Sequence, residues 1–163
     1  MRLYLSASYP RKHELRGYAA RLKDLGHEIT SSWLDEPEYG DDGVSMTPGP
    51  DYCELASRDC VDINRSNGFV AFTEPPNGPP RGGRHVEFGY AIAKNKALFV
   101  IQHRENAFHH MPNVLFFDDF NHFVTTWGHV GELEYNISTK LYSERKGSYP
   151  MLNPWPAGAV QDE

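Results

Sequence analysis

Glu87 is a carboxylate at the start of a helix-like segment, directly after a turn rich in glycine and proline, 78-GPPRGGRHVEFGYAIAKNKALFVI-101. In the first turn of a helix, free backbone N–H groups and the helix dipole stabilise negative charge and lower the pKa of a carboxyl group. We therefore expect an ionised Glu87, and an ionised carboxylate is suited to act as a nucleophile. The same position also suits an acid that only stabilises the helix, although the partner of a capping box is missing, because Arg84 stands three residues earlier.

Asp59 is a second carboxylate in an unusual place. On a helix over roughly 51 to 66 it falls inside the apolar stripe, between Leu55 and Ile63. A carboxylate among apolar side chains is costly unless it is paired or lines a cleft. A buried salt bridge and a functional acid both fit this position, whereas Asp62, at the edge of the stripe, is expected to be solvated.

Polar side chains also gather around the end of the first expected strand. Tyr4 lies on that strand, where its phenol either hydrogen-bonds a carboxylate in a crevice or packs in the core. Ser6, Ser8 and Arg11 follow at a helix entrance, and such a loop can hold a phosphate through side chains and N–H groups. The loop lacks the glycine spacing of a P-loop, so this prediction rests on composition alone.

The elements that must position these residues alternate along the chain. Strand patterns cover 2–7, 28–33, 68–73, 97–102 and 114–117, and helical patterns cover 13–26, 51–66 and 84–95, followed by an amphipathic stretch from about 119 to 145. Such alternation predicts an α/β, doubly wound, flavodoxin-like fold with a parallel five-stranded sheet and helices on both faces. In these sheets the site lies beyond the carboxyl ends of the strands, where the strand order reverses.

Domain organisation is expected to be simple. We predict a single domain over 1–146 and a C-terminal tail over 147–163. The connection 34–50 is rich in Pro, Gly and Asp and has no periodicity, which is typical of a lid, a binding loop or a disordered excursion.

Composition narrows the class of partner. A formal net charge of −6 over 163 residues argues against a nucleic-acid polymer, because phosphate-tracking surfaces need clustered Lys and Arg. The sequence contains no apolar run of membrane-spanning length and no signal-peptide pattern. We therefore expect a soluble cytoplasmic protein with a small-molecule substrate.

Cysteine and histidine patterns give no metal or disulfide prediction. Cys53 and Cys60 are seven residues apart on one expected helix, about 10 Å, which is beyond disulfide reach. Most of the histidines, at His103, His109, His110, His122 and His129, lack the spacing of a zinc site. We expect structural or surface roles for them, with no metal and no cofactor.

Three segments together resemble the nucleoside 2-deoxyribosyltransferase family, which includes the 2′-deoxynucleoside 5′-monophosphate N-glycosidases. They are 3-LYLSAS-8, 59-DCVDINRSNGFVAF-72 and 82-GGRHVEFGYAIAKNKALFVI-101. The similarity spans roughly residues 2 to 117, and its most specific part is the helix pattern E-[ILFV]-G-x-A, which begins here at Glu87.

The resemblance implies roles for the candidate residues. Glu87 would attack the anomeric carbon of the sugar and form a covalent glycosyl-enzyme, which passes the sugar to another base or to water. Asp59 would protonate the departing base, and Tyr4 would orient Glu87. Gly83 and Gly89 would leave room for the sugar. Because family members complete the site from a neighbouring chain, a homodimer or larger homo-oligomer is expected, with apolar contact surface from the stretch after 119.

Departures from the family pattern bear on the substrate. Transferases of the family carry an Asp six residues before the nucleophile, and here that residue is Arg81. Arg81 and Arg84 would bind a 5′-phosphate, which favours nucleotides, unless the segment 75–83 shifts the register and turns both to solvent. Asn113 is a looser match to an Asn that reaches a neighbouring subunit's site.

Two other function classes fit the same fold. A binding module that holds a nucleotide without turnover is one, because fold does not fix function. The combination of Glu87, Asp59 and Tyr4 separates it from an enzyme, since a pure binder has no need of this set. A flavodoxin-like redox protein is the other, and the first loop lacks a phosphate-binding pattern for a flavin.

Overall fold

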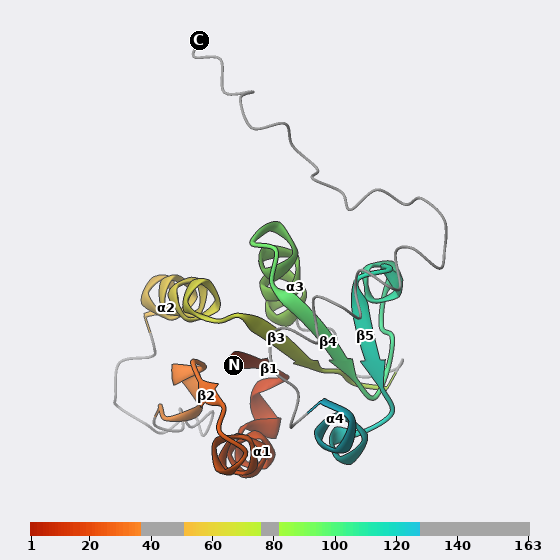
Figure 1. The fold of residues 1–163 in the computed structure, drawn as a ribbon. Helices are drawn as coiled ribbons and strands as arrows, with labels where there is room; N and C mark the ends of the chain where they lie inside the picture. Colours follow the sequence, from red (N-terminus) through yellow and green to blue (C-terminus); the bar gives the residue numbers. More distant parts are fainter. Residues whose placement is uncertain (37–50, 76–81, 128–163) are drawn as a thin grey trace.

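A computed structural model describes residues 1–36, 51–75 and 82–127 as one parallel sheet covered by helices (Figure 1). The five strands lie in the order β2-β1-β3-β4-β5, which confirms the doubly wound fold. Their bounds are β1 Arg2–Ser6, β2 Glu28–Ile29, β3 Gly68–Phe72, β4 Ala97–Ile101 and β5 Val114–Phe117. The helices are α1 Lys12–Asp24, α2 Tyr52–Arg65, α3 Gly83–Ala93 and α4 Phe120–Trp127, with short 3-10 helices η1 Tyr9–Arg11, η2 Ser32–Leu34 and η3 Ala107–His110.

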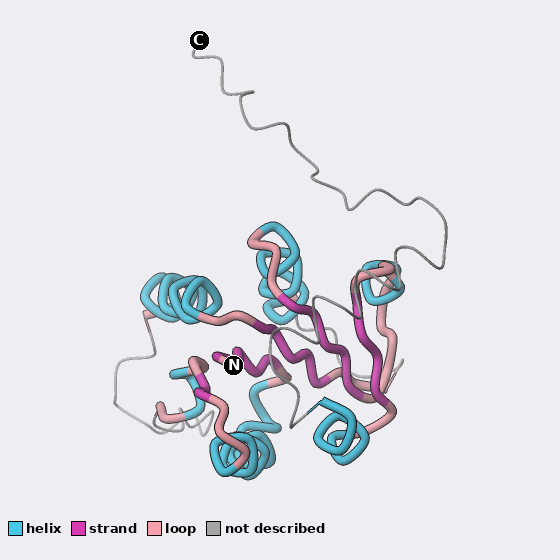
Figure 2. Tube along the Cα trace, in the orientation of Figure 1, coloured by secondary structure: helices cyan, strands magenta, loops and turns pink. Residues whose placement is uncertain are grey.

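Side-chain alternation along the strands builds a core on each face of the sheet. Leu3 and Leu5 of β1 belong to the core shared with α1 and α4, whereas Tyr4 belongs to the core shared with α2 and α3. Figures 1 and 2 show these two helix pairs on opposite faces of the sheet. Because alternate strand residues point to the same face, Ser6 shares the α2 and α3 side with Tyr4.

The prediction of a strand over 28–33 is wrong for most of its length. Only Glu28–Ile29 pairs with β1, and the chain then turns into η2. The reason is side-chain hydrogen bonding. The Ser31 hydroxyl accepts from the N–H of Leu5 at 2.5 Å and donates to its carbonyl at 3.2 Å, so it satisfies groups that a longer β2 would have paired.

The described part of the C-terminal region packs on its own sheet. The buried side chains of α4 are Phe120, Phe123, Val124 and Trp127, and they join the core on the α1 face. They are therefore not available as the intersubunit surface expected after 119, and the remainder of that stretch and the tail lie outside the described residues. Residues 37–50, most of the expected binding loop, also lie outside them.

Cys53 and Cys60 are free, and both are exposed on α2. Within the described ranges, no helix is long and apolar enough to cross a membrane.

Candidate active site

A cavity of about 220 Å³ opens beside the carboxyl ends of β1 and β3. These neighbouring strands are where the strand order reverses, so the cavity lies where this fold places its ligands. Its walls come from the loop after β1, from η2 and the residues after it, and from α2 and α3. The lining residues are Ala7, Ser8, Tyr9, Trp33, Glu36, Leu55, Asp59, Gly83, Arg84 and Glu87.

Glu87 lies one turn inside α3 and is largely buried at the cavity wall. It is the fifth residue of the helix, and the first turn of α3 contains no acidic residue. The pKa of Glu87 is raised to about 7: burial is the largest cause and the Asp59 charge adds to the rise, while the Ser6 hydrogen bond and the nearby Tyr4 hydroxyl lower it. The predicted lowering of this pKa by the helix terminus is therefore wrong, because desolvation outweighs the helix dipole one turn into the helix.

The Ser6 hydroxyl donates a 2.5 Å hydrogen bond to Oε2 of Glu87. Ser6 is the last residue of β1 and is only 1% exposed. The resemblance implied that Tyr4 would orient Glu87. The Tyr4 hydroxyl is buried and lies near both carboxylates, yet it has no well-aligned hydrogen bond among the described residues. The aligned contact to the carboxylate is therefore made by Ser6.

Asp59 and Tyr4 lie close enough to Glu87 to influence its charge, and the resemblance implied that the three residues share one site. Burial raises the pKa of Asp59, and Asp62 adds to the rise. Burial also raises the pKa of Tyr4 well above its usual value, with further contributions from Glu87 and Asp59. A raised carboxyl pKa keeps a proton available for donation, which is what a general acid requires.

Asp62 is not solvated, contrary to expectation. It is 3% exposed and accepts hydrogen bonds from the backbone N–H and the hydroxyl of Ser32, at 2.8 Å and 2.5 Å. These bonds fix η2 against α2, and η2 carries Trp33, whose indole N–H donates to the Leu5 carbonyl at 2.9 Å. Asp62 thus holds an aromatic wall of the cavity in place. The sequence alone could not predict this role, because it depends on a tertiary contact with Ser32.

The predicted phosphate loop separates into two parts. Ser8 lines the cavity and donates a 2.5 Å hydrogen bond to Glu74. Arg11 does not line it, because its guanidinium is held by Glu14 at 2.8 Å and by the Thr73 carbonyl at 3.0 Å. Gly83 lines the cavity, and a Cβ there would meet no atom within 4 Å, so open space lies next to its backbone.

Arg84 also lines the cavity, held by Glu105. Its Nη2 lies 2.7 Å from Glu105 Oε1, and its Nε lies 3.2 Å from Oε2. The remaining nitrogen, Nη1, is buried and has no hydrogen-bond partner within the described ranges. Arg84 therefore does not turn to solvent, and Nη1 is a buried donor that no described residue satisfies.

Of the two remaining predicted residues, Arg81 lies outside the described residues, and Asn113 is not brought to this cavity. Asn113 directly precedes β5, at the amino edge of the sheet, opposite the carboxyl edge where the cavity opens. In the role that the resemblance implied, Asn113 would serve only the site of another chain.

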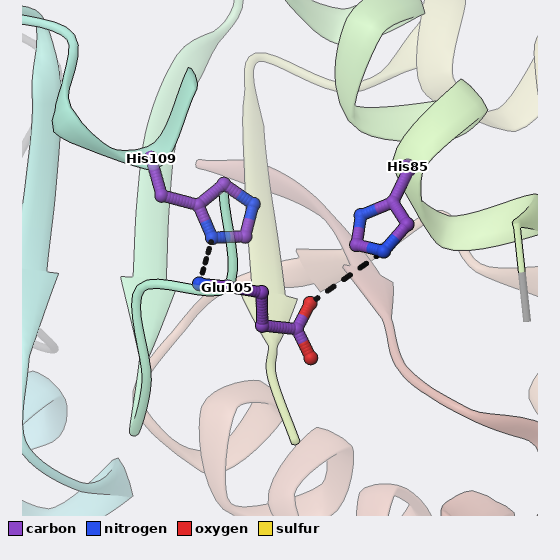
Figure 3. A group of neighbouring side chains, drawn as sticks. All are labelled: His85, Glu105 and His109. Atoms are coloured by element: carbon purple, nitrogen blue, oxygen red, sulfur yellow. Dashed lines mark hydrogen bonds and ion pairs between the residues drawn. The ribbon is translucent and has the colours of Figure 1, made fainter. Parts of the chain in front are cut away.

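A cluster that the sequence analysis missed lies next to Arg84. Possible ligand atoms of His85, Glu105 and His109 lie within 4.8 Å of one another (Figure 3). The three residues come from α3, the loop after β4 and η3. No sequence spacing links them, because only the tertiary fold brings these segments together.

The donor atoms of this cluster are engaged within the protein. Glu105 is paired with Arg84 and also accepts the N–H of Glu74 at 2.7 Å. Nδ1 of His109 accepts the N–H of Glu105 at 3.2 Å (Figure 3), and burial lowers the pKa of His109, which favours its neutral form. Nε2 of the same ring faces Nδ2 of Asn106 at 3.4 Å, so both ring nitrogens have partners within the protein. The cluster therefore anchors Arg84 and the loop after β4.

Comparisons with known proteins support the fold. No family model matches the sequence, and no curated protein gives a significant match. Among solved structures, the chain is similar to the Clostridium botulinum CMP N-glycosidase BcmB, with 18% identity and a TM-score of 0.50 over 77% of this chain and 97% of that one.

Two further solved structures are similar at lower TM-scores. A conserved protein from Enterococcus faecalis V583 has 15% identity and a TM-score of 0.48, covering 86% of this chain and 87% of that one. BlsM has 16% identity and a TM-score of 0.47, covering 91% of this chain and 95% of that one. At 18% identity the likeness to BcmB shows the fold alone, because proteins of one fold carry out different functions.

Proposed function

We propose that the protein cleaves the N-glycosidic bond of 2′-deoxynucleosides or their 5′-monophosphates through a covalent glycosyl ester on Glu87. The observation that carries this proposal is a largely buried carboxylate at a cavity wall, with a second carboxylate of raised pKa beside it. BcmB, whose fold is similar, is described as a CMP N-glycosidase, and its name supports the same class of reaction.

The first step is displacement of the base. A Glu87 oxygen forms a bond to C1′ of the sugar, and the C1′–N bond breaks with its electron pair leaving on the base nitrogen. Asp59 donates its proton to that nitrogen as the base departs. Trp33 and Leu55 give the cavity an apolar wall against which a planar base can pack.

The second step releases the sugar. Water or a second base attacks C1′, the bond between C1′ and the Glu87 oxygen breaks, and Asp59 takes a proton from the attacking group. Two displacements at C1′ retain its configuration, as in retaining glycosidases. The choice between water and a second base depends on how each fits the vacated half of the cavity.

The charges of the site favour catalysis over passive binding of an anion. A binder of nucleotides gains nothing from burying carboxylates at its cavity, because buried negative charge disfavours an anionic ligand and raises the pKa of each acid. A site that needs a nucleophile and an acid does require such a pair.

The pH profile provides one prediction. Glu87 must be ionised and Asp59 protonated, so the reactive state holds one proton between the two carboxyls. Since the pKa of Glu87 is about 7, that shared proton is lost as pH rises above 7. We expect kcat/KM for base release to fall about tenfold per pH unit above the upper pKa of the pair. It should also fall in acid, where both carboxyl groups are protonated. Initial rates from pH 4 to 9 test this, and a flat profile would contradict the shared-proton pair.

Arg84 makes the monophosphate the favoured substrate form. It lines the cavity and its Nη1 has no partner within the described ranges. A charge-assisted hydrogen bond to phosphate contributes about 1.5–3 kcal/mol. We expect Arg84→Ala to lower kcat/KM for deoxynucleoside monophosphates by roughly 10- to 100-fold and to change that of unphosphorylated nucleosides little.

A matched control is available for this variant. Arg104 lies over the Phe116 ring, donates to the His109 carbonyl at 3.2 Å and does not line the cavity, so Arg104→Ala removes a nearby positive charge that is not part of the cavity wall. Arg81→Ala examines the arginine outside the described residues in the same assay. If Arg84→Ala treats nucleosides and monophosphates alike, Arg84 does not bind the phosphate, and a nucleoside transferase becomes the better assignment.

Incubation with a panel of deoxynucleosides and their monophosphates, with and without a second free base, tests the reaction itself. Chromatography separates hydrolysis, which releases free sugar, from transfer, which forms a new nucleoside. Absence of both products across the panel would favour the binding module.

A further inference from the structure

The hydroxyl of Ser6 contacts the proposed nucleophile, Glu87, and does not face the cavity where a substrate would bind. It donates to Oε2 of Glu87 at 2.5 Å, from a side chain that is 1% exposed at the end of β1. In the sheet, Ser6 is paired in register with Ala71 of β3. Ser6 is absent from the residues that line the cavity, so a ligand there would meet Glu87 before it met the serine.

The two carboxylate oxygens of Glu87 are therefore not equivalent. Oε2 is occupied by a short hydrogen bond, and a charge-assisted hydrogen bond of this kind withdraws electron density from the oxygen that accepts it. Oε1 receives no hydrogen bond of good geometry in the part of the chain that the structure describes. The less engaged oxygen is the better nucleophile.

We propose that Ser6 is a positioning residue that holds Oε2 of Glu87 and so selects Oε1 as the oxygen that attacks C1′. This proposal rests on the proposed function and specifies its atoms. When Oε1 forms its bond to C1′, Oε2 becomes the carbonyl oxygen of the ester and continues to accept from Ser6. The serine neither gains nor loses a proton, and the leaving base takes its proton from Asp59 as before.

The hydrogen bond also supports the ionised form of Glu87. Burial and the Asp59 charge both raise the pKa of this carboxyl group, and the Ser6 hydrogen bond is the first of the contributions that lower it. Loss of the hydroxyl is therefore expected to raise the pKa of Glu87 further and to leave a smaller fraction of it ionised at neutral pH.

Ser6→Ala and Ser6→Cys test this role, with Ser66→Ala as the matched control. Ser66 is another buried serine, 2% exposed, and its hydroxyl donates to the Ile63 carbonyl at 2.8 Å, away from the cavity. Ser66→Ala thus reports the effect of losing a buried serine hydroxyl in general. Ser6→Cys keeps a weak donor of similar size.

We expect Ser6→Ala to lower kcat for base release by about 10- to 100-fold with little change in KM, because a hydrogen bond to a charged group is lost while the cavity wall is unchanged. Ser6→Cys should recover part of this loss, and the alkaline limb of the pH profile should move upward in Ser6→Ala only. A kcat and pH profile for Ser6→Ala that match those of Ser66→Ala would overturn the proposal.

A second measurement does not depend on turnover. Titration of the Glu87 carboxyl by carbon NMR, identified by its absence in Glu87→Gln, should show a higher pKa in Ser6→Ala than in wild type. An unchanged pKa would also overturn the proposal. Failure of the proposed function is distinguishable, because it appears as an inactive wild type or an active Glu87→Gln, and the titration still reports the contact.

Discussion

Glu87→Gln is expected to lose at least about 10⁴-fold in turnover while it keeps the fold. The amide has the shape of the carboxyl group and still accepts a hydrogen bond from Ser6, but it cannot displace the base, so the covalent step fails. Glu87→Ala should be similarly inactive. Base release under single-turnover conditions, followed by chromatography, measures the loss.

Thermal unfolding provides the control for Glu87→Gln. The pKa of Glu87 in the folded protein, about 7, is above its ordinary value of 4.5. The folded state therefore holds this proton more tightly than the unfolded state, so wild-type stability falls as pH rises from about 4.5 to about 7. Glutamine avoids that penalty, and the variant should be more stable than wild type at pH 8, by at most about 3 kcal/mol, with the difference vanishing near pH 4.

An active Glu87→Gln would remove the nucleophile assignment. A variant that is inactive and also unfolds at lower temperature at pH 8 would show that Glu87 contributes to stability, which contradicts a carboxylate that is buried for its chemistry.

Asp59→Asn is expected to lose about 10²- to 10⁴-fold in release of natural bases. Asparagine keeps the size and polarity of the side chain but has no proton to donate to the leaving nitrogen. The loss should depend on the leaving group. A deoxyriboside of a nitroazole, whose anion departs without protonation, should form the glycosyl ester at close to the wild-type rate.

The comparison of leaving groups identifies the general acid. If Asp59→Asn impairs natural and nitroazole substrates equally, Asp59 acts by another means, such as binding or packing. If it impairs neither, the proton comes from elsewhere in the cavity. Base release in the pre-steady state separates formation of the ester from its breakdown, which also requires Asp59.

The fold was predictable because local patterns agree with it. β3 and β4 are buried at every position and were visible as apolar runs, and α2 begins where Asp51 accepts the N–H groups of Cys53 and Glu54. The prediction of a strand at 28–33 was wrong because the Ser31 hydroxyl bonds the backbone of β1 in place of a backbone pair. That contact depends on a neighbouring strand and leaves no local pattern in the sequence.

The sequence predicted which residues lie at the site better than it predicted their pKa values and hydrogen-bond partners. The helical wheel placed Asp59 inside the apolar stripe, where a cleft and a buried salt bridge both fitted, and the resemblance indicated the roles of Glu87 and Tyr4. The pKa of Glu87 was mispredicted because the helix terminus is local whereas desolvation depends on the whole fold. Ser6 was predicted to bind a phosphate. Strand alternation places it on the same face of the sheet as Tyr4, and this pattern was a usable indication of its contact with Glu87.

Residues that act only through tertiary contacts could not be predicted from any pattern in the sequence. Asp62 acts through Ser32 of η2, thirty residues earlier in the chain. Glu105 holds Arg84 across twenty-one residues of sequence. Neither spacing corresponds to a helix or strand period, so no pattern in the sequence joins these pairs.

Identification of the covalent adduct tests the central claim most directly. Asp59→Asn is mixed with the nitroazole deoxyriboside, quenched rapidly in acid, digested and analysed by mass spectrometry, because ester formation remains fast in this variant while breakdown is slow. We predict one added deoxyribosyl group on the peptide that contains Glu87 and none in the Asp59→Asn, Glu87→Gln double variant. Rapid release of the azole with the sugar attached to another residue, or to none, would contradict the account.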